Sequence, residues 1–309
     1  MAKIGFIGFG SMASLIATKI IETEVATPEE IILYSNSKNE HFNQFYTKYP
    51  TAELADNEAE IFTKADHSFV CKLPLAVLPL MKDCAAVLTP DRHVVSIAAG
   101  VSTSDIIEIT PGLQVSKLIP SLTTAVNVGT TLIAHAETVN QTNTSWLETT
   151  FEHFGHVMTI REENMDIASD LTSSSPGIIA AIFEQFVEAA LRRSSLSDAE
   201  VFQMINFALA GTSKLLVEED YTFSGLIQRV ATKDGTTAEG VELSKAQLPN
   251  FLTNSLTEHK TNMLLVKKKF KHKSENYSHK KKVAIFNRNL FYSCSGLTST
   301  FTLLGLLPS

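Results

Sequence analysis

The stretch "KIGFIGFGSMA" (3–13) limits the possible fold of this chain more than any other. A short apolar run, typical of a buried strand, is followed by glycines at 8 and 10 and an alanine at 13, the spacing G-x-G-x-x-A. In this context the first glycine permits a tight turn, the second admits a pyrophosphate, and the alanine lets a helix pack closely on the strand. The free N–H groups at the start of that helix attract an anion. The motif predicts a dinucleotide site formed by Gly8, Phe9, Gly10, Ser11 and Met12; the alternative is a glycine-rich turn without a ligand.

Short apolar runs alternate with helical patterns through residues 1–162. After the first strand, "SMASLIATKIIE" (11–22) predicts a helix, and the run "LAVLPLMKDCAAVL" predicts another. Further strands are predicted at 30–35, 67–73, 93–99, 113–119, 130–136 and 156–162. Strands that alternate with helices of this length form a mostly parallel, doubly wound α/β sheet of the Rossmann type. We therefore predict a dinucleotide-binding Rossmann domain over 1–162.

The pattern becomes helical after about residue 163. A proline in its first turn opens a helix over 176–193, and "SDAE" supplies a capping box for a helix over 197–219. A third helical pattern covers about 245–266. These helices are apolar around much of their circumference and need more partners than one small bundle supplies. A helical domain over 163–266 that forms an interlocked homodimer is predicted, and further assembly of dimers is left open.

Charge separates a third segment from these two domains. Residues 264–309 hold nine Lys/Arg and one Glu, whereas 1–263 hold 17 Lys/Arg and 32 Asp/Glu. The acidic body argues against nucleic-acid binding by the main domains. For the basic tail, 267–309, a disordered solvated extension is predicted; a membrane-surface or nucleic-acid contact and an altered reading frame are the alternatives.

Cysteine usage and hydropathy bear on location. The three cysteines have no metal-ligand spacing and no disulfide framework, which favours a reducing cytoplasm and no metal. The N-terminus is a poor signal peptide, and no run reaches the roughly 18 apolar residues of a membrane span.

The end of the second predicted strand discriminates between cofactors. An NAD site usually carries Asp or Glu there to bind the ribose hydroxyl. This chain instead has hydroxyl, amide and ammonium groups, at Ser35, Asn36, Ser37 and Lys38. Such groups suit a 2′-phosphate, so NADPH is favoured over NADH; an ordinary exposed lysine at 38 is the alternative.

The glycine motif is followed in order by "NSK" (36–38), "DNEAE" (56–60), "CKLP" (71–74), "SIAAGVS" (96–102), "KLIPSLT" (117–123), "LTSSSPG" (171–177) and "VATKDGTTAEG" (230–240). These eight motifs resemble, in order and spacing, those of pyrroline-5-carboxylate reductases. The resemblance covers about 1–262. The family usually reads Met-Pro-Asn-Thr-Pro where this chain has "IPSLT" (119–123), Ser-Gly-Ser-Gly-Pro-Ala where it has "TSSSPG" (172–177), and Ser-Pro-Gly-Gly-Thr-Thr where it has "TKDGTT" (232–237). "IPS" and the lysine at 233 look more like the late-competence ComER branch.

The resemblance implies further cofactor contacts and an activity. Asn57, Lys72 and Pro74 would line the adenosine side, Ala98, Ala99 and Gly100 would pass under the nicotinamide, and Pro120 would shape the floor near the reacting carbon. The implied reaction is the NADPH-dependent reduction of the cyclic imine 1-pyrroline-5-carboxylate to proline. One alternative is a ComER-like paralogue that binds NADP(H) with little turnover and has a regulatory or accessory role in competence. The other is a reductase of another small imine or carbonyl acid, with Lys233 selecting a more acidic substrate.

The polar stretch "ATKDGTTAEG" (231–240) is the candidate carboxylate site. Backbone N–H groups and hydroxyls in a tight turn before a helix can hold a small anion. The substrate residues expected from this turn and the segment before it are Val230, Thr232, Gly235, Thr236 and Thr237, in a pocket between the two domains. Thr237, Ser174 and Asp220 are the candidates for catalytic contacts. Ser174 would lie near the imine, and the resemblance implies that Asp220 lies near the developing amine. The alternative is an ordinary turn in which Asp and Gly turn the chain and Thr caps the helix.

Overall fold

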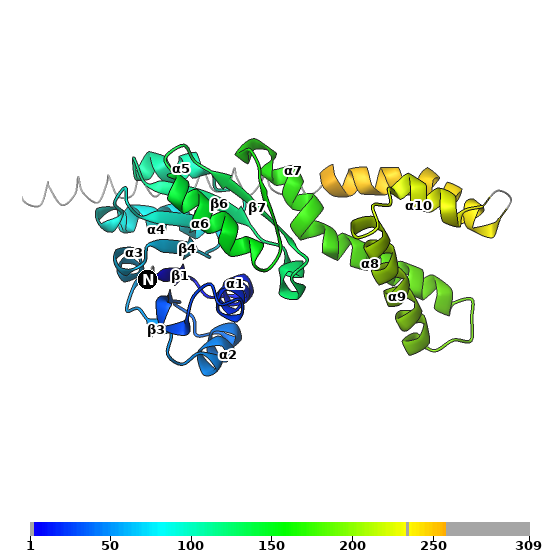
Figure 1. The fold of residues 1–309 in the computed structure, drawn as a ribbon, viewed down its shortest axis with the longest axis horizontal. Helices are drawn as coiled ribbons and strands as arrows, with labels where there is room; N and C mark the ends of the chain where they lie inside the picture. The colour runs from blue at the N-terminus through cyan, green and yellow to red at the C-terminus, as the bar shows by residue number, and fades with distance from the viewer. Residues whose placement is uncertain (1–2, 233–234, 258–309) are drawn as a thin grey trace, which may run out of the picture.

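In a computed structural model that describes residues 3–232 and 235–257, a sheet domain is followed by an arm of helices (Figure 1). The sheet has eight strands in the order β3-β2-β1-β4-β5-β6-β7-β8, and every neighbouring pair is parallel except β6 with β7. The strands are β1 (Ile4–Ile7), β2 (Ile31–Tyr34), β3 (Glu53–Leu54), β4 (His67–Val70), β5 (His93–Ser96), β6 (Gln114–Ile119), β7 (Thr130–His135) and β8 (His156–Thr159). The predicted doubly wound sheet and each predicted strand are confirmed. The two-residue β3 was missed because it is too short to show alternation.

Helices cover both faces of the sheet. One face packs against α1 (Ser11–Glu22), α2 (Glu40–Lys48) and α6 (Gln141–Glu152), and the other against α3 (Glu58–Lys64), α4 (Pro74–Asp83) and α5 (Thr103–Ile109). Short 3-10 turns lie at η1 (Pro28–Glu30), η2 (Ala85–Val87), η3 (Leu122–Val126) and η4 (Glu162–Asn164). Strands β1 to β6 run in the same direction, so their carboxyl ends lie at one edge of the sheet, where ligands of such folds bind.

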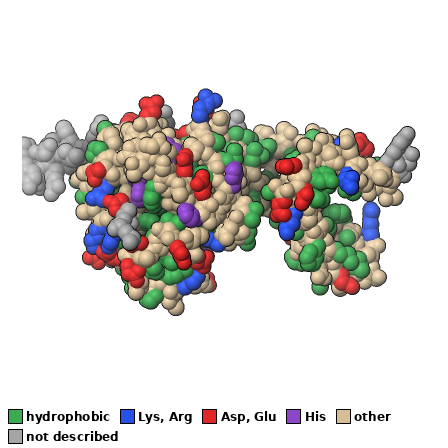
Figure 2. Space-filling view, in the orientation of Figure 1, with side chains coloured by type: hydrophobic (Ala, Val, Ile, Leu, Met, Phe, Trp, Pro, Cys, Tyr) green, Lys and Arg blue, Asp and Glu red, His purple; other side chains and the backbone are tan. Residues whose placement is uncertain are grey.

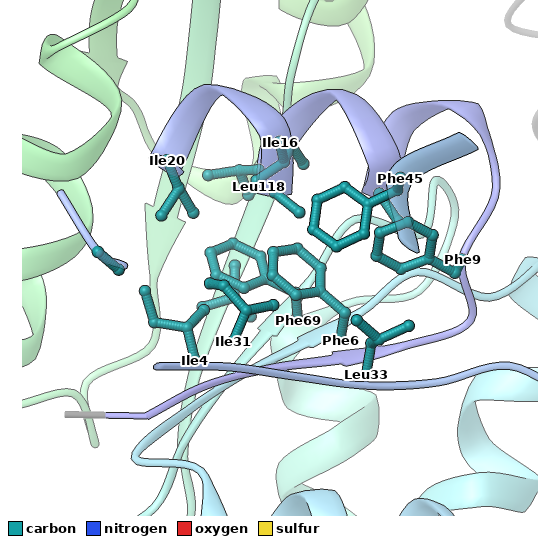
Figure 3. Packing of buried hydrophobic residues seen from close by; sticks show 14 of the residues in the cluster. Ile4, Phe6, Phe9, Ile16, Ile20, Ile31, Leu33, Phe45, Phe69 and Leu118 are labelled. Carbon is teal, nitrogen blue, oxygen red and sulfur yellow. The ribbon is translucent and has the colours of Figure 1, made fainter. Parts of the chain in front are cut away.

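Aromatic side chains in the core hold the glycine turn that follows β1. Phe6 of β1 stacks on Phe69 of β4 with ring centroids 5.1 Å apart (Figure 3). Phe9, between the two motif glycines, is 1% exposed and lies 4.8 Å from the ring of Phe45 on α2. Burying a phenylalanine is worth about 1.5–3 kcal/mol, so Phe9 anchors the glycine turn to the core.

The helical arm begins with a helix that is interrupted by a π-helical turn. Its elements are α7 (Met165–Ser169), the π turn η5 (Asp170–Ser174), α8 (Ser175–Leu191), α9 (Asp198–Val217), α10 (Phe223–Val230) and a helix over 236–257. The capping box of Ser197 and Glu200 is present as predicted. The third predicted helix starts earlier than expected, and the eight-residue α10 was missed. Residues 258–266 of that prediction and the basic tail lie outside the described residues.

The arm leaves many large apolar side chains uncovered (Figure 2). Phe207 of α9 is 71% exposed and Phe223 of α10 is 77% exposed, and α8 and α10 contain no buried residue. A surface this apolar on a folded arm is typical of a protein–protein interface. Within residues 3–232 and 235–257, no helix is long and apolar enough to cross a membrane.

Candidate cofactor and substrate site

The glycine turn has the geometry that its sequence predicts. Gly8 has φ +82°, and a Cβ there would lie 2.7 Å from the carbonyl oxygen of Cys71, so a side chain is excluded. Gly10 caps α1 without a side-chain hydrogen bond, and a Cβ at this position would meet nothing within 4 Å. Open space therefore adjoins Gly10 at the head of α1, where the first N–H groups of the helix have no partner within it, and a pyrophosphate requires both features.

Only parts of the predicted turn can face a ligand. The side chain of Phe9 is buried, and its carbonyl accepts a hydrogen bond from Asn39 Nδ2 at 2.8 Å. Phe9 is thus a packing residue whose role in the site is to hold the backbone. Ser11 is exposed and Met12 is partly buried.

The segment after β2 presents donors and no carboxylate. Ser35 Oγ donates to the carbonyl of Ser37 at 3.0 Å, which curls the segment, and Asn36, Ser37 and Lys38 are exposed. Lys38 forms no ion pair with any described residue, so its ammonium group is available to an anion. The arrangement fits a ribose that carries a phosphate.

Two residues assigned to the adenosine side already have partners. Asn57 Oδ1 accepts a hydrogen bond from the N–H of Glu60 at 3.0 Å and so caps α3. Lys72 Nζ lies 2.7 Å from Glu58 Oε1 in a partly buried ion pair. Pro74 is the first residue of α4. The polar groups of Asn57 and Lys72 therefore already form contacts within the protein on the predicted adenosine side of the site.

The β5–α5 loop, defined as residues 97–102, lies at the same edge. Ala98 is buried, Ala99 is exposed, and Gly100 is buried with φ +79°. Pro120, which follows β6, is also buried. Of these four predicted residues, Ala99 alone presents its side chain to the surface.

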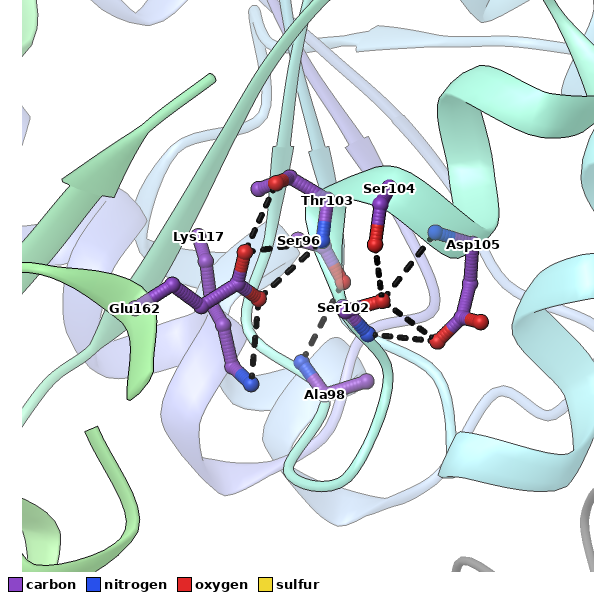
Figure 4. Close-up of polar contacts among 8 residues, drawn as sticks. All are labelled: Ser96, Ala98, Ser102, Thr103, Ser104, Asp105, Lys117 and Glu162. Carbon is purple, nitrogen blue, oxygen red and sulfur yellow. Dashed lines mark hydrogen bonds and ion pairs between the residues drawn. The ribbon is translucent and has the colours of Figure 1, made fainter. Parts of the chain in front are cut away.

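A polar clamp that the sequence did not reveal holds the end of this loop (Figure 4). The N–H of Thr103, the first residue of α5, donates to Glu162 Oε1 at 3.0 Å and Oε2 at 3.2 Å, and Thr103 Oγ1 donates to Oε2 at 2.7 Å. Lys117 Nζ of β6 lies 3.6 Å from Glu162 Oε1. Glu162 lies 59 positions from Thr103 and 45 from Lys117, so no short-range sequence pattern indicates these contacts.

A second contact joins the sheet edge to the helical arm. Ser121, fully buried, donates from Oγ to the carbonyl of Thr172 at 2.9 Å. Thr172 lies in η5, and π turns of this kind occur frequently at functional sites. Ser174 closes the turn at the start of α8, and its hydroxyl has no hydrogen bond to a described residue. Ser174 is therefore free to contact a ligand, as its predicted role requires.

The remaining predicted substrate residues lie far from the sheet in a single chain. Figure 1 shows α10 and the start of the 236–257 helix at the end of the arm that points away from the sheet. Asp220 is exposed with φ +55°, just beyond α9. In one chain the arm is extended and the start of the 236–257 helix does not face the sheet edge, so the expected pocket between the two domains stays a prediction. Lys233 and Asp234 lie outside the described residues.

In the turn around Gly235, one of the backbone N–H groups that could hold an anion is already used within the protein. The N–H of Gly235 donates to the carbonyl of Thr232 at 3.0 Å, so that group is used within the turn. Thr236 and Thr237 are the first residues of the 236–257 helix and both are exposed. Their N–H groups have no partner inside the helix, which leaves them as the donors for an anion.

A row of three histidines, two of them buried, crosses the sheet beside Trp146 of α6. His67 and His93 have Nδ1 atoms 3.1 Å apart, His93 Nε2 lies 2.8 Å from Ser116 Oγ, and that hydroxyl lies 2.8 Å from His135 Nδ1. His67 also stacks on Trp146 at 3.4 Å. Burial lowers the pKa of His67 to about 4 and, with the neighbouring histidines, that of His93 to about 3. Both histidines begin predicted strands, and both are buried in the sheet rather than exposed.

Two families match the sequence. Residues 162–261 match the family described as pyrroline-5-carboxylate reductase dimerisation, and residues 3–100 match NADP oxidoreductase, coenzyme F420-dependent. Pyrroline-5-carboxylate reductase 3 of Bacillus subtilis (strain 168) is 36% identical over 250 residues, covering 81% of this chain and 91% of that protein. ComE operon protein 4 of the same strain is 26% identical over 272 residues, covering 87% of this chain and 99% of that protein.

Solved structures share the fold. The pyrroline carboxylate reductase of Plasmodium falciparum with NADP bound superimposes with a TM-score of 0.74 at 18% identity, covering 87% of this chain and 98% of that one. The pyrroline-5-carboxylate reductase of Coxiella burnetii gives a TM-score of 0.74 at 21% identity, with the same coverage. At such identities the likeness establishes the arrangement of the sheet domain and helical arm.

Proposed function

Because this chain belongs to the pyrroline-5-carboxylate reductase family, we propose that it is an NADPH-dependent imine reductase that converts 1-pyrroline-5-carboxylate to proline in the cytoplasm. The observation that carries the proposal is the open glycine turn at the head of α1, beside a β2 end that bears donors and no carboxylate. A dinucleotide with a 2′-phosphate fits both features.

The residues that would hold NADPH come from three loops at one sheet edge. The first N–H groups of α1 would take the pyrophosphate, Ser35 to Lys38 the 2′-phosphate, and the β5–α5 loop the nicotinamide. The cofactor supplies the hydride when bound. The protein therefore has to orient the imine, an effect worth about 7–11 kcal/mol in favourable cases.

The substrate calls for a carboxylate cradle and a hydrogen bond near its nitrogen. A protonated cyclic imine accepts hydride readily, so a strong general acid is not needed. The N–H groups of Thr236 and Thr237, with the hydroxyls of Thr232 and Thr237, would hold the carboxylate. The unpaired hydroxyl of Ser174 lies where the arm leaves the cofactor edge and would contact the imine nitrogen, while Asp220 would steady the amine.

A second copy of the chain would complete this site. In one chain the start of the 236–257 helix lies at the end of the arm away from α1 (Figure 1). Uncovered apolar side chains along α8, α9, α10 and the 236–257 helix supply the surface for a partner. An interlocked homodimer would bury that surface and bring one turn toward the sheet edge of the other chain.

Substituting Phe207 by glutamate is expected to shift the protein from dimer to monomer at micromolar concentration. Phe207 is 71% exposed in the single chain, and burying an unpaired carboxylate in its place would cost several kcal/mol. Light scattering measures the mass, and circular dichroism checks the helix content. Phe207→Leu, which keeps an apolar side chain, should stay dimeric; a wild-type protein that is monomeric with intact helices would contradict the dimer.

Turnover of pyrroline-5-carboxylate, followed as NADPH oxidation, tests the proposed reaction. Thr237→Val should lower kcat/KM by ~10–100-fold, the value of one hydrogen bond to a charged group. Thr237→Ser keeps the hydroxyl and should stay near wild type. Calorimetric NADPH binding on the same samples separates loss of cofactor from loss of substrate orientation.

Tight NADPH binding without turnover would favour the ComER-like alternative. Similarity to ComE operon protein 4 over 99% of that protein, together with the altered residues at 119–123, 172–177 and 232–237, motivates it. Turnover of a different imine or carbonyl acid would favour the third candidate, with Lys233 selecting a second carboxylate. A selective rise in KM for that acid in Lys233→Ala would identify it.

A further inference from the structure

We propose that Glu162 is a positioning residue for the nicotinamide end of the cofactor, acting through Thr103 and the β5–α5 loop. The inference rests on the proposed function, because it assigns this loop to the nicotinamide. Glu162 belongs to the connection that enters the helical arm, and its carboxylate reaches across to the first residue of α5 (Figure 4). The connection and the loop are thus held by one side chain.

The contacts of Glu162 are directional. Both of its oxygens accept from the N–H of Thr103, and one also accepts from the Thr103 hydroxyl. Thr103 is 8% exposed and Lys117, on the other side of the carboxylate, is 4% exposed. Hydrogen bonds to an ionised acceptor are about twice as strong as neutral ones, so this clamp resists displacement.

The clamp fixes one end of a short loop whose other end is already rigid. Ser96 closes the buried strand β5, and the loop of 97–102 returns to Thr103 through Gly100 at φ +79°. The Ser102–Asp105 capping box holds the helix itself but not its place relative to the sheet. Glu162 supplies that second restraint. A shift of about 1 Å in a positioning group can cost ~100-fold in rate.

The competing explanation is that Glu162 only stabilises the fold and has no effect on the cofactor. Binding of the two halves of the cofactor, measured separately, distinguishes these two explanations. The adenosine half would bind at Gly10 and at Ser35 to Lys38, which lie on other loops. Adenosine 2′,5′-bisphosphate carries this half without a nicotinamide. A positioning role for Glu162 therefore predicts a change in NADPH binding and hydride transfer but none in binding of the fragment.

The test compares Glu162→Gln with Glu163→Gln in the full-length protein. The first substitution keeps the size of the side chain but removes the negative charge that faces Thr103 and Lys117. Glu163 is the matched control, since its side chain is 65% exposed and pairs at the surface with Arg161. Single-turnover hydride transfer, calorimetric affinity for NADPH and for adenosine 2′,5′-bisphosphate, and melting temperature are measured for each.

Glu162→Gln should slow hydride transfer by ~10–100-fold and weaken NADPH binding, with the fragment affinity unchanged and Glu163→Gln like wild type. Unchanged hydride transfer and NADPH affinity in Glu162→Gln, or a parallel loss of fragment affinity, would overturn the proposal. If Glu162→Gln does not fold, Thr103→Val and Thr103→Ser replace it: the valine should show the same selective loss and the serine should restore function. If the wild type turns over no pyrroline-5-carboxylate, the proposed reaction fails, while the comparison of NADPH with the fragment still decides the role of Glu162.

Discussion

Replacing Gly10 by aspartate is expected to abolish NADPH binding and leave the sheet domain folded. A Cβ at position 10 would meet no heavy atom within 4 Å beyond its chain neighbours, so the backbone there can carry a side chain. Aspartate is also a preferred N-cap residue and would bond the first N–H groups of α1. Those are the groups that a pyrophosphate needs, and the new carboxylate would repel it as well. Loss of two charge-assisted hydrogen bonds at ~1.5–3 kcal/mol each predicts at least a ~100-fold weaker complex.

Calorimetric titration with NADPH measures this loss, and the melting temperature without ligand shows whether the fold is intact. Gly10→Ser is the matched variant, because its hydroxyl can cap the helix without adding charge. It should lose less affinity than Gly10→Asp. Tight NADPH binding by a folded Gly10→Asp protein would contradict the cofactor site.

Acid is expected to destabilise the sheet domain well before its carboxylates titrate. The pKa of His67 falls from 6.5 to about 4 on folding and that of His93 to about 3, so both stay neutral in the folded state. The unfolded chain takes up these protons as the pH drops below 6.5. The stabilisation is therefore complete above pH 6.5 and is lost as the pH falls toward 4. Each histidine should lower the free energy of unfolding by roughly 1.4 kcal/mol per pH unit in that window.

Urea unfolding between about pH 7 and pH 5 measures the slope, a range in which few carboxylates titrate. Trp146, the one tryptophan of the chain, stacks on His67 and reports the domain by its fluorescence. His67→Phe keeps a ring against Trp146 but cannot take up a proton, so the slope should fall by about 1.4 kcal/mol per pH unit. Equal slopes in wild type and His67→Phe would show that His67 is not the source.

The fold was predictable where the signal lies in neighbouring residues. The run from Lys3 to Ala13 contains the strand, the turn and the helix start, and the structure places each of them where the spacing predicts. The capping box at Ser197 marks the start of α9 for the same reason. By contrast, α10 has eight residues, too few for a helical period to stand out.

The parts that were missed depend on distant partners. Histidines at strand starts look exposed by residue type, and only the sheet register shows that His67 and His93 face each other under Trp146. The sequence does not distinguish Glu162 from Glu163, since the difference between them is made by Thr103, 59 positions away from Glu162. A sequence does not give the direction in which α8 leaves the sheet, so it could not tell whether the turn at 232–237 faces the sheet edge of its own chain or of a partner.

The π turn at Asp170–Ser174 makes the length of the domain junction matter more than its composition. α7 packs Met165 against the sheet, whereas α8 presents its sides to other helices or a partner, and the two run on without a loop between them. One residue rotates a helix by about 100°. Inserting or deleting a single residue here would leave both helices intact and yet turn every face of the arm relative to the sheet. Substitutions along this junction can accumulate without turning the arm, whereas the number of residues across it sets how the arm is oriented on the sheet.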